Sequence, residues 1–180
     1  QWNHQNIAYY DKLDTTQSRY VLGAVFYMAK ELGCKHILID SLTKCGLPYG
    51  ERGAEKDFID ALCATAKAFN IHIHLVCHVR KPQQGGQEYR PTKFDVRGAA
   101  ELTDLVHNVI IHWSNKAKAN AVFKQENGGS LSESELELLD KPDQLMIVEK
   151  QRNGQFEGAI ALNRHACLQF YKGAVQFPEL

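Results

Sequence analysis

The sequence predicts an α/β fold: an open, mostly parallel sheet with crossover helices, and antiparallel hairpin strands at its C-terminal edge. Two short apolar runs, 36–40 and 71–77, each follow a segment whose apolar residues recur at helical spacing. Such alternation is typical of parallel sheets, because parallel neighbours need a crossover connection. Later, Asn153 and Gly154 lie between two apolar runs, and this dipeptide is typical of a hairpin turn.

The amino-terminal half follows the alternation of strand and helix. Thr15 and Thr16 supply capping residues before the first helical pattern. Gly33 is expected to end that helix, since glycine suits the backbone that follows a helix C-terminus. We therefore expect a strand at 7–11, helices at 17–32 and 57–69, and strands at 36–40 and 71–77.

The carboxyl-terminal half contains the predicted antiparallel strands. Residues 114–142 are polar and acidic, and we expect them to form an exposed, partly disordered insertion with one short helix. With 180 residues, the chain suits a single domain over 1–180 that carries this insertion. The expected strands are 105–111, a hairpin of 144–150 and 156–162, and a last strand at about 167–172.

Composition excludes some classes of protein and leaves others open. The chain has 21 basic and 21 acidic side chains, so a nucleic-acid partner would need a local basic patch or several subunits acting together. Its five cysteines are odd in number and lack C-x-x-C spacing, which favours a reducing cytoplasm over disulfides. No signal peptide is visible, and no apolar run approaches the roughly 20 residues that span a bilayer. We therefore expect a cytoplasmic protein without a membrane partner.

Two polar residues end the predicted parallel strands. Asp40 follows four apolar residues, and His78 ends the next strand. Ligands of open α/β sheets bind at the carboxyl ends of the strands. Asp40 could hold the water shell of Mg²⁺ beside a phosphate, and His78 could hydrogen-bond that phosphate. The alternatives are an ordinary strand end and a histidine that caps a strand. A zinc site is disfavoured, because ligands along one extended strand diverge.

Basic residues follow the second strand and occur again near the hairpin. The 79–94 loop carries Arg80, Lys81, Arg90 and Lys93, and it either contacts a nucleic-acid backbone or is a solvated surface loop. Lys150 and Arg152 precede the Asn-Gly turn. They could reach a nucleotide phosphate, including one on a neighbouring subunit, or they are part of an ordinary charged hairpin.

One expected nucleotide motif is missing. No G-x-x-x-x-G-K-[ST] occurs in the 180 residues. The segment 50–56 has the wrong spacing, and no Ser or Thr follows its lysine. The phosphate cradle of a P-loop enzyme is therefore not encoded in these residues.

Four motifs in order carry a resemblance to a known family. The segments ILIDSLTK, HLVCHVRKP, RPTKFDVRGAAELTDLVHNVII and IVEKQRNG resemble the RecA-like motor domain of the DnaB-like hexameric replicative helicases. The likeness is strongest to phage primase-helicases and the mitochondrial replicative helicase, which tend to place His at the position of His78. It implies an ATP-dependent DNA helicase that works as a ring, a hexamer in this family, on single-stranded DNA. It also implies ATP or another nucleoside triphosphate, Mg²⁺, and a bacterial or phage-infected cell.

The resemblance implies a role for each matched position. Asp40 matches the Walker B carboxylate that binds Mg²⁺ through water, and His78 matches the γ-phosphate sensor. Arg80 and the residues after it, including Lys81, Arg90 and Lys93, match the loop that grips DNA. The remaining matches are Arg97 and Gly98 as the Arg-Gly turn near that loop, and Lys150 and Arg152 as the trans-acting lysine and arginine finger.

The family places its P-loop and catalytic glutamate before the residues that match 7–11. We therefore expect both upstream of Gln1, and we expect these 180 residues alone to be inactive. Two alternatives stay open: another RecA-like ATPase, such as a recombinase, and a non-catalytic fragment that binds DNA or a partner.

Overall fold

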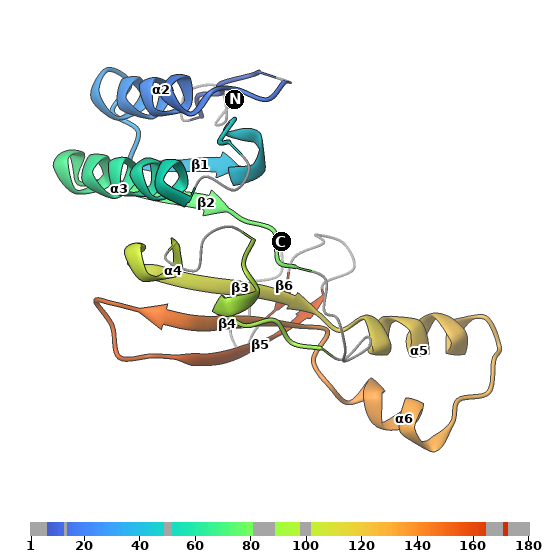
Figure 1. Ribbon diagram of the computed structural model, residues 1–180. Helices are drawn as coiled ribbons and strands as arrows, with labels where there is room; N and C mark the ends of the chain where they lie inside the picture. The colour runs from blue at the N-terminus through green and yellow to red at the C-terminus, as the bar shows by residue number, and fades with distance from the viewer. Residues whose placement is uncertain are drawn as a thin grey trace. The chain divides into compact units, whose positions relative to one another are not determined.

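The computed structural model describes residues 7–12, 14–48, 52–80, 89–97, 102–164 and 171–172 (Figure 1). Contacts between residues divide the chain into two compact units. The first comprises 1–80 and 96–106, and the second comprises 81–95 and 107–180. The expectation of a single RecA-like domain over the whole chain stays a prediction.

The first unit is a parallel strand pair covered on one face by two helices. Strand β1 pairs in parallel with β2, and Asp40 lies opposite Val76. Along β1, Ile37 and Ile39 are buried, and they pack with residues of both helices in one apolar core. The elements are α2 (Ser18–Lys30), β1 (His36–Asp40), η1 (Leu42–Lys44), α3 (Arg52–Phe69), β2 (His72–Val76) and α4 (Leu102–Leu105).

The other face of the strand pair carries histidines and an exposed leucine. Leu38 is 69% exposed. The rings of His72 and His74 stack with centroids 4.4 Å apart, and that of His36 stacks 5.8 Å from His74. Burial, followed by the nearby charges of His72 and His36, lowers the pKa of His74. Among the residues that the structure describes, no group of three or more His, Cys, Asp and Glu side chains could hold a metal ion.

Several predicted elements of the first unit form, and one does not. The helix expected at 17–32 is α2, and Gly33, at φ +66°, ends it as predicted. The strands expected at 36–40 and 71–77 are β1 and β2. The strand expected at 7–11 was wrong: residues 7–12 form no regular element. None of the helices in the described ranges is long and apolar enough to cross a membrane.

The second unit is built on an antiparallel sheet in the order β3-β4-β5-β6. Along β3, buried Val109, Ile111 and Trp113 alternate with exposed residues. A β-bulge interrupts the pairing of β3 with β4 between Val109 and Ile110. The elements are η3 (Lys93–Asp95), β3 (Asn108–Ser114), α5 (Lys116–Glu126), α6 (Glu133–Leu139), β4 (Gln144–Gln151), β5 (Gly158–Arg164) and β6 (Tyr171–Lys172).

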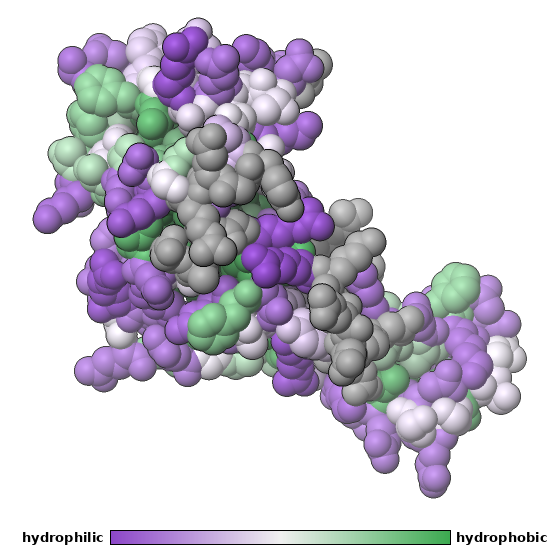
Figure 2. Space-filling model, viewed as in Figure 1, coloured by the Kyte–Doolittle hydropathy of each residue, from purple (hydrophilic) through white to green (hydrophobic). Residues whose placement is uncertain are grey.

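The polar insertion is a pair of helices, which we call the helical hairpin (115–143). Both helices are capped by side chains: Asn115 accepts from the Lys118 N–H, and Ser132 forms a capping box with Glu135. A salt bridge of 2.8 Å joins Lys124 to Glu135 across the pair. The expectation of a partly disordered segment with one short helix was therefore wrong. In Figure 2, hydrophilic residues cover most of the visible face here, with smaller apolar areas.

Two predictions about the sheet need correction. The late strands were expected at the edge of the parallel sheet, but among the described strands they pair only with one another. Consecutive strands can pair with one another in an antiparallel sheet, because a short hairpin is enough to join them. An apolar pattern in the sequence shows where a strand lies but not which strand it pairs with. The fold is thus α/β, but the described strands are not mostly parallel.

The strand boundaries also differ in detail from those expected. Strand β3 begins at Asn108, three residues after the expected start at 105, because the preceding residues turn through α4. The hairpin of β4 and β5 forms as predicted, but its ladder ends at Val148 opposite Gly158. Asn153 and Gly154 therefore lie within a longer connection rather than a two-residue turn. Of the strand expected at about 167–172, residues 167–170 lie outside the described residues, and Tyr171–Lys172 form β6.

Candidate nucleotide and nucleic-acid site

Asp40 and His78 lie at or just beyond the carboxyl ends of neighbouring parallel strands. Asp40 is the last residue of β1, and its partner Val76 is the last residue of β2. His78 comes two residues later, and both side chains are exposed. The two predicted nucleotide residues therefore lie at the same edge of the sheet, where open α/β sheets bind ligands.

A tightly packed turn fixes the backbone after Asp40. Ser41 is 4% exposed, and its hydroxyl lies 2.8 Å from that of Thr43. The Thr16 N–H donates to the Lys44 carbonyl oxygen at 3.0 Å. Gly46 has φ +58°, and a Cβ there would lie 2.8 Å from the Thr16 oxygen. Only glycine fits this close approach, so the turn holds Asp40 at a defined place.

Neither of the two thiols near this edge is reactive: Cys45 is buried and Cys77 is half-buried. Burial raises the pKa of Cys45 to about 11. Burial also raises the pKa of Cys77 to about 11, with smaller contributions from the nearby Cys45 and Glu55. A nucleophilic thiol needs a lowered pKa, so neither cysteine suits covalent chemistry.

The backbone just after β2 pairs with the predicted Arg-Gly turn. The Arg97 N–H donates to the His78 carbonyl oxygen at 2.8 Å. Val79 and Val96 form an antiparallel bridge beside it. The predicted phosphate sensor is thus joined by its own backbone to the far end of the basic loop. Arg80 and Arg97 are exposed, whereas Lys81 and Gly98 lie outside the described residues.

We call residues 89–97 the loop stem, and one carboxylate organises its first part. Oδ2 of Asp95 accepts from the Thr92 N–H at 2.7 Å, the Thr92 hydroxyl at 3.0 Å and the Tyr89 hydroxyl at 2.7 Å. The hydrogen bond from the Tyr89 hydroxyl to Asp95 is the largest of the effects that raise the pKa of Tyr89. The stem therefore closes on itself around Asp95.

The loop stem is also attached to the antiparallel sheet. The indole N–H of Trp113 donates to the Tyr89 carbonyl oxygen at 2.7 Å. The Lys93 N–H donates to Oε2 of Glu149, on β4, at 3.3 Å. The guanidinium of Arg90 lies 5.2 Å from the centroid of the Trp113 ring. Two of the predicted DNA-binding cations, Arg90 and Lys93, are thus carried by an anchored segment.

The predicted lysine and arginine finger lie at the end of β4. Lys150 is half-buried opposite Val109, next to the β-bulge. Arg152 is exposed just beyond the strand, and its N–H donates to the His107 carbonyl oxygen at 2.9 Å. Both belong to the second unit, whereas Asp40 and His78 belong to the first.

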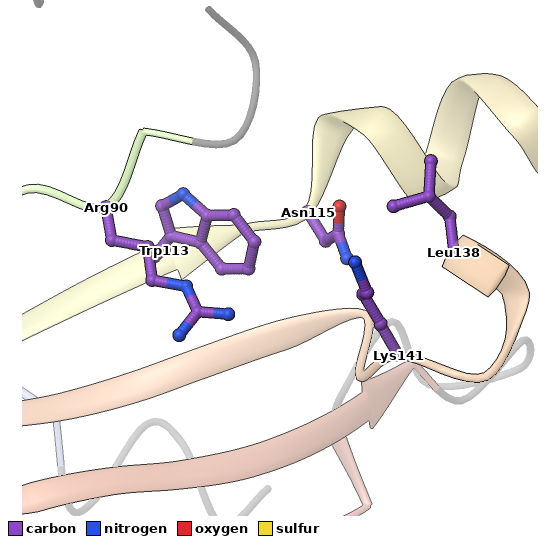
Figure 3. Close-up of a pocket in the computed structure, with 5 residues that line it drawn as sticks. All are labelled: Arg90, Trp113, Asn115, Leu138 and Lys141. Atoms are coloured by element: carbon purple, nitrogen blue, oxygen red, sulfur yellow. The ribbon is translucent and has the colours of Figure 1, made fainter. Parts of the chain in front are cut away.

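A pocket of about 260 Å³ opens beside the loop stem (Figure 3). Trp113 and Asn115 line it from the end of β3 and the start of the helical hairpin. Arg90 comes from the loop stem, and Leu138 and Lys141 come from the far end of the helical hairpin.

Sequence reasoning missed the residues that hold the loop stem. These are Asp95, Tyr89, Trp113 and Glu149. Thr92 and Asp95 are three residues apart, which is the spacing of a capping box, so this one contact left a signal in the sequence. The attachments to Trp113 and Glu149 join distant residues and left none.

The fold and the order of these residues resemble the DnaB-like replicative helicases, and comparisons with known proteins confirm that resemblance. The chain is 27% identical over 108 residues to a DNA helicase/primase of Enterobacteria phage T3. It also matches a solved structure of a DnaB-like replicative helicase, studied for its interactions with primase, at a TM-score of 0.60 and 15% identity. No family model matches.

The two relatives are much longer than the matched region. The alignment with the phage protein covers 56% of this chain and 19% of that protein. The structural match covers 87% of this chain and 34% of the helicase. Over the matched region, the chain therefore shares its general fold with a DnaB-like replicative helicase.

Proposed function

We propose that the chain is the carboxyl-terminal part of the motor domain of an ATP-dependent replicative DNA helicase that works as a ring on single-stranded DNA. The observation that carries this proposal is the placement of Asp40 and His78 at one edge of a parallel strand pair, directly before the basic loop. The similarity to a phage helicase/primase supports it.

Asp40 suits an Mg²⁺ ion that keeps most of its water. Mg²⁺ usually takes one or two carboxylates together with phosphates and retains several waters. An exposed carboxylate on a fixed turn fits that role, and the described residues offer no cluster that would enclose the ion. Bound Mg²⁺ would neutralise charge on the phosphates of ATP or another nucleoside triphosphate.

His78 would hydrogen-bond the terminal phosphate from the neighbouring strand end. Its side chain faces solvent, while its carbonyl oxygen is bonded to the Arg97 N–H. A shift of His78 on loss of the phosphate would therefore move the base of the loop. This is a short physical path from nucleotide state to DNA contact.

The basic loop and its stem would hold the phosphates of single-stranded DNA. Arg80, Arg90 and Arg97 are exposed cations in the described part of this segment. Contacts to phosphates give affinity without sequence preference and depend on salt. The full proposed set is Arg80, Lys81, Arg90, Lys93, Arg97 and Gly98.

Lys150 and Arg152 would act on the nucleotide of a neighbouring subunit. Arg152 is exposed beyond the end of β4, where an approaching subunit could be reached. An arginine supplied in trans stabilises the charge of phosphoryl transfer and is worth roughly 10³–10⁵ in rate. The active site would then be completed only in the ring.

Strand unwinding by the full-length protein is the primary test. We expect ATP-dependent separation of a forked duplex, and its loss in Asp40→Asn, because the carboxylate that holds Mg²⁺ is removed. Asp60→Asn, at an exposed position of α3, is the matched control and should unwind normally. ATP-dependent strand exchange without unwinding would instead favour a recombinase.

Mixed rings test the finger separately. Arg152→Ala subunits mixed with wild-type subunits should lower ATPase activity out of proportion to their fraction, because each removes the finger from a neighbour's site. A loss strictly proportional to the fraction of variant would contradict action in trans.

A further inference from the structure

We propose that the pocket between the loop stem and the helical hairpin is a backbone-phosphate site for single-stranded DNA, to which Lys141 contributes. This inference rests on the proposed function and extends it: the DNA path would continue from the basic loop onto the polar insertion. The site is lined by Arg90, Trp113, Asn115, Leu138 and Lys141 (Figure 3).

The first cation of this site is held in place before any ligand arrives. Arg90 is exposed, yet its guanidinium lies over the Trp113 ring at 5.2 Å. The preceding residue, Tyr89, is fixed on both sides, by the Trp113 indole N–H and by Asp95. A guanidinium with a fixed backbone loses less freedom on binding, which favours affinity.

The second cation is carried by a similarly anchored backbone. The carbonyl oxygen of Lys141 accepts from the Lys118 ammonium at 2.6 Å, and its N–H donates to the Leu138 carbonyl oxygen at 3.1 Å. The next residue, Pro142, accepts from the Asn115 amide at 3.2 Å. The exposed side chain of Lys141 therefore rises from a rigid base at the pocket wall.

The pocket's charge and size both suit a phosphodiester. Among the described residues, its lining contains two cations and no carboxylate. Asp140, the residue before Lys141, is exposed and is not among the lining residues, and Asp143 forms a salt bridge of 2.9 Å with Lys118. Pockets for drug-sized molecules span roughly 300–1,000 Å³. A volume of about 260 Å³ suits a phosphate with part of its sugar better than a whole nucleotide.

Trp113 supports the site without reading bases. It is 8% exposed, and Arg90 lies over its ring, so no open indole face is offered for stacking. Asn115 is likewise occupied, since its side chain caps α5 and bonds Pro142. The site should therefore bind backbone phosphate regardless of base sequence.

The test is the salt dependence of oligo-dT binding by the 180-residue chain, followed by fluorescence anisotropy. Lys141→Gln should weaken binding and make the slope of log K against log salt less steep by about 0.7, the loss of one single-strand phosphate contact. Lys141→Arg keeps the charge and should keep the slope. Lys116→Gln, at an exposed position of α5 outside the pocket lining, should also keep it.

Each other outcome overturns the inference in a recognisable way. If Lys141→Gln and Lys116→Gln change the slope equally, the pocket is not a site. If Arg80→Ala weakens binding but Lys141→Gln does not, the proposed function stands and this inference fails. If the wild-type chain binds no oligo-dT, this inference fails, whereas the proposed function is decided by the unwinding assay of the full-length protein. If only binding of free dTMP depends on Lys141, the ligand is a nucleotide phosphate and not a DNA strand.

Discussion

The two regions that carry the candidate site are held in different ways. Asp40 and His78 follow strands fixed by apolar packing, and Ile37 and Ile39 of β1 are only 5% and 9% exposed. The loop stem, by contrast, is held by a few polar contacts that converge on Asp95 and on the Trp113 indole. Packing is distributed over many atoms, whereas a polar anchor can be released by one change.

This difference matches the demands of the proposed motor. In the proposed motor, the strand ends that bind the nucleotide have to keep their geometry through each cycle of hydrolysis. A close-packed core resists displacement and so suits this role. A DNA-binding segment has to shift between defined positions, which hydrogen bonds allow when they exchange as a set. Substitutions in the two regions should therefore fail in distinguishable ways.

The largest expected effect on stability comes from a cavity in the apolar core that packs against β1 and β2. Phe58→Ala should lower the free energy of unfolding of the first unit by about 3–5 kcal/mol, because it leaves a cavity at a residue 3% exposed. Urea unfolding of the chain measures this. Phe123→Ala, at a site 68% exposed in the helical hairpin, should change it by no more than about 0.5 kcal/mol. If both substitutions lowered the free energy of unfolding equally, β1 and β2 would not be held by the packed core.

Releasing the loop stem should lower stability less than Phe58→Ala does, but it should weaken DNA binding more. Asp95→Ala removes the acceptor of three hydrogen bonds and should destabilise the stem locally by about 2 kcal/mol. Faster amide hydrogen exchange in 89–97 and weaker oligo-dT binding are expected, with unchanged exchange in β1 and β2. If exchange rises in both regions together, the two are not held independently.

A milder change separates the attachment of the stem from its internal structure. Trp113→Phe keeps an aromatic ring but removes the N–H that binds the Tyr89 carbonyl oxygen. We expect a loss of about 1 kcal/mol in local stability, seen as faster exchange at the stem. The Tyr89–Asp95 contact should persist, so an altered Tyr89 pKa in Trp113→Phe would argue that the two anchors are coupled.

The smallest effect concerns pH and the helical hairpin. The Lys124 ammonium, followed by the Ser132 N–H, lowers the pKa of Glu135 from 4.5 to about 2. Because the pKa is lowered in the folded state, the contribution of Glu135 to stability is present above pH 4.5 and is lost as pH falls towards 2. Amide exchange in α5 and α6 across this range should show the loss. Glu135→Gln should abolish that pH dependence, and Glu133→Gln should not.

The same contrast explains what could be predicted from sequence. The apolar runs that end at Asp40 and before His78 report burial directly, so both strands and their common edge were predictable. The helical hairpin was predicted to be partly disordered because its composition is polar. Ser132 and Glu135 nevertheless show the spacing of a capping box, which indicates the start of a helix. The loop stem depends on Trp113 and Glu149, which are 24 and 56 positions from their partners. Such contacts exist only once the sheet has formed.

Nucleotide-dependent DNA affinity of the full-length protein tests the central claim most directly. Wild-type protein should bind oligo-dT with clearly different affinity in ATP-analogue and ADP states, because the proposed phosphate contact of His78 would be linked to the loop stem. His78→Ala should still bind both ligands but with one DNA affinity in the two states. An unchanged difference in His78→Ala would contradict the coupling between the strand edge and the basic loop.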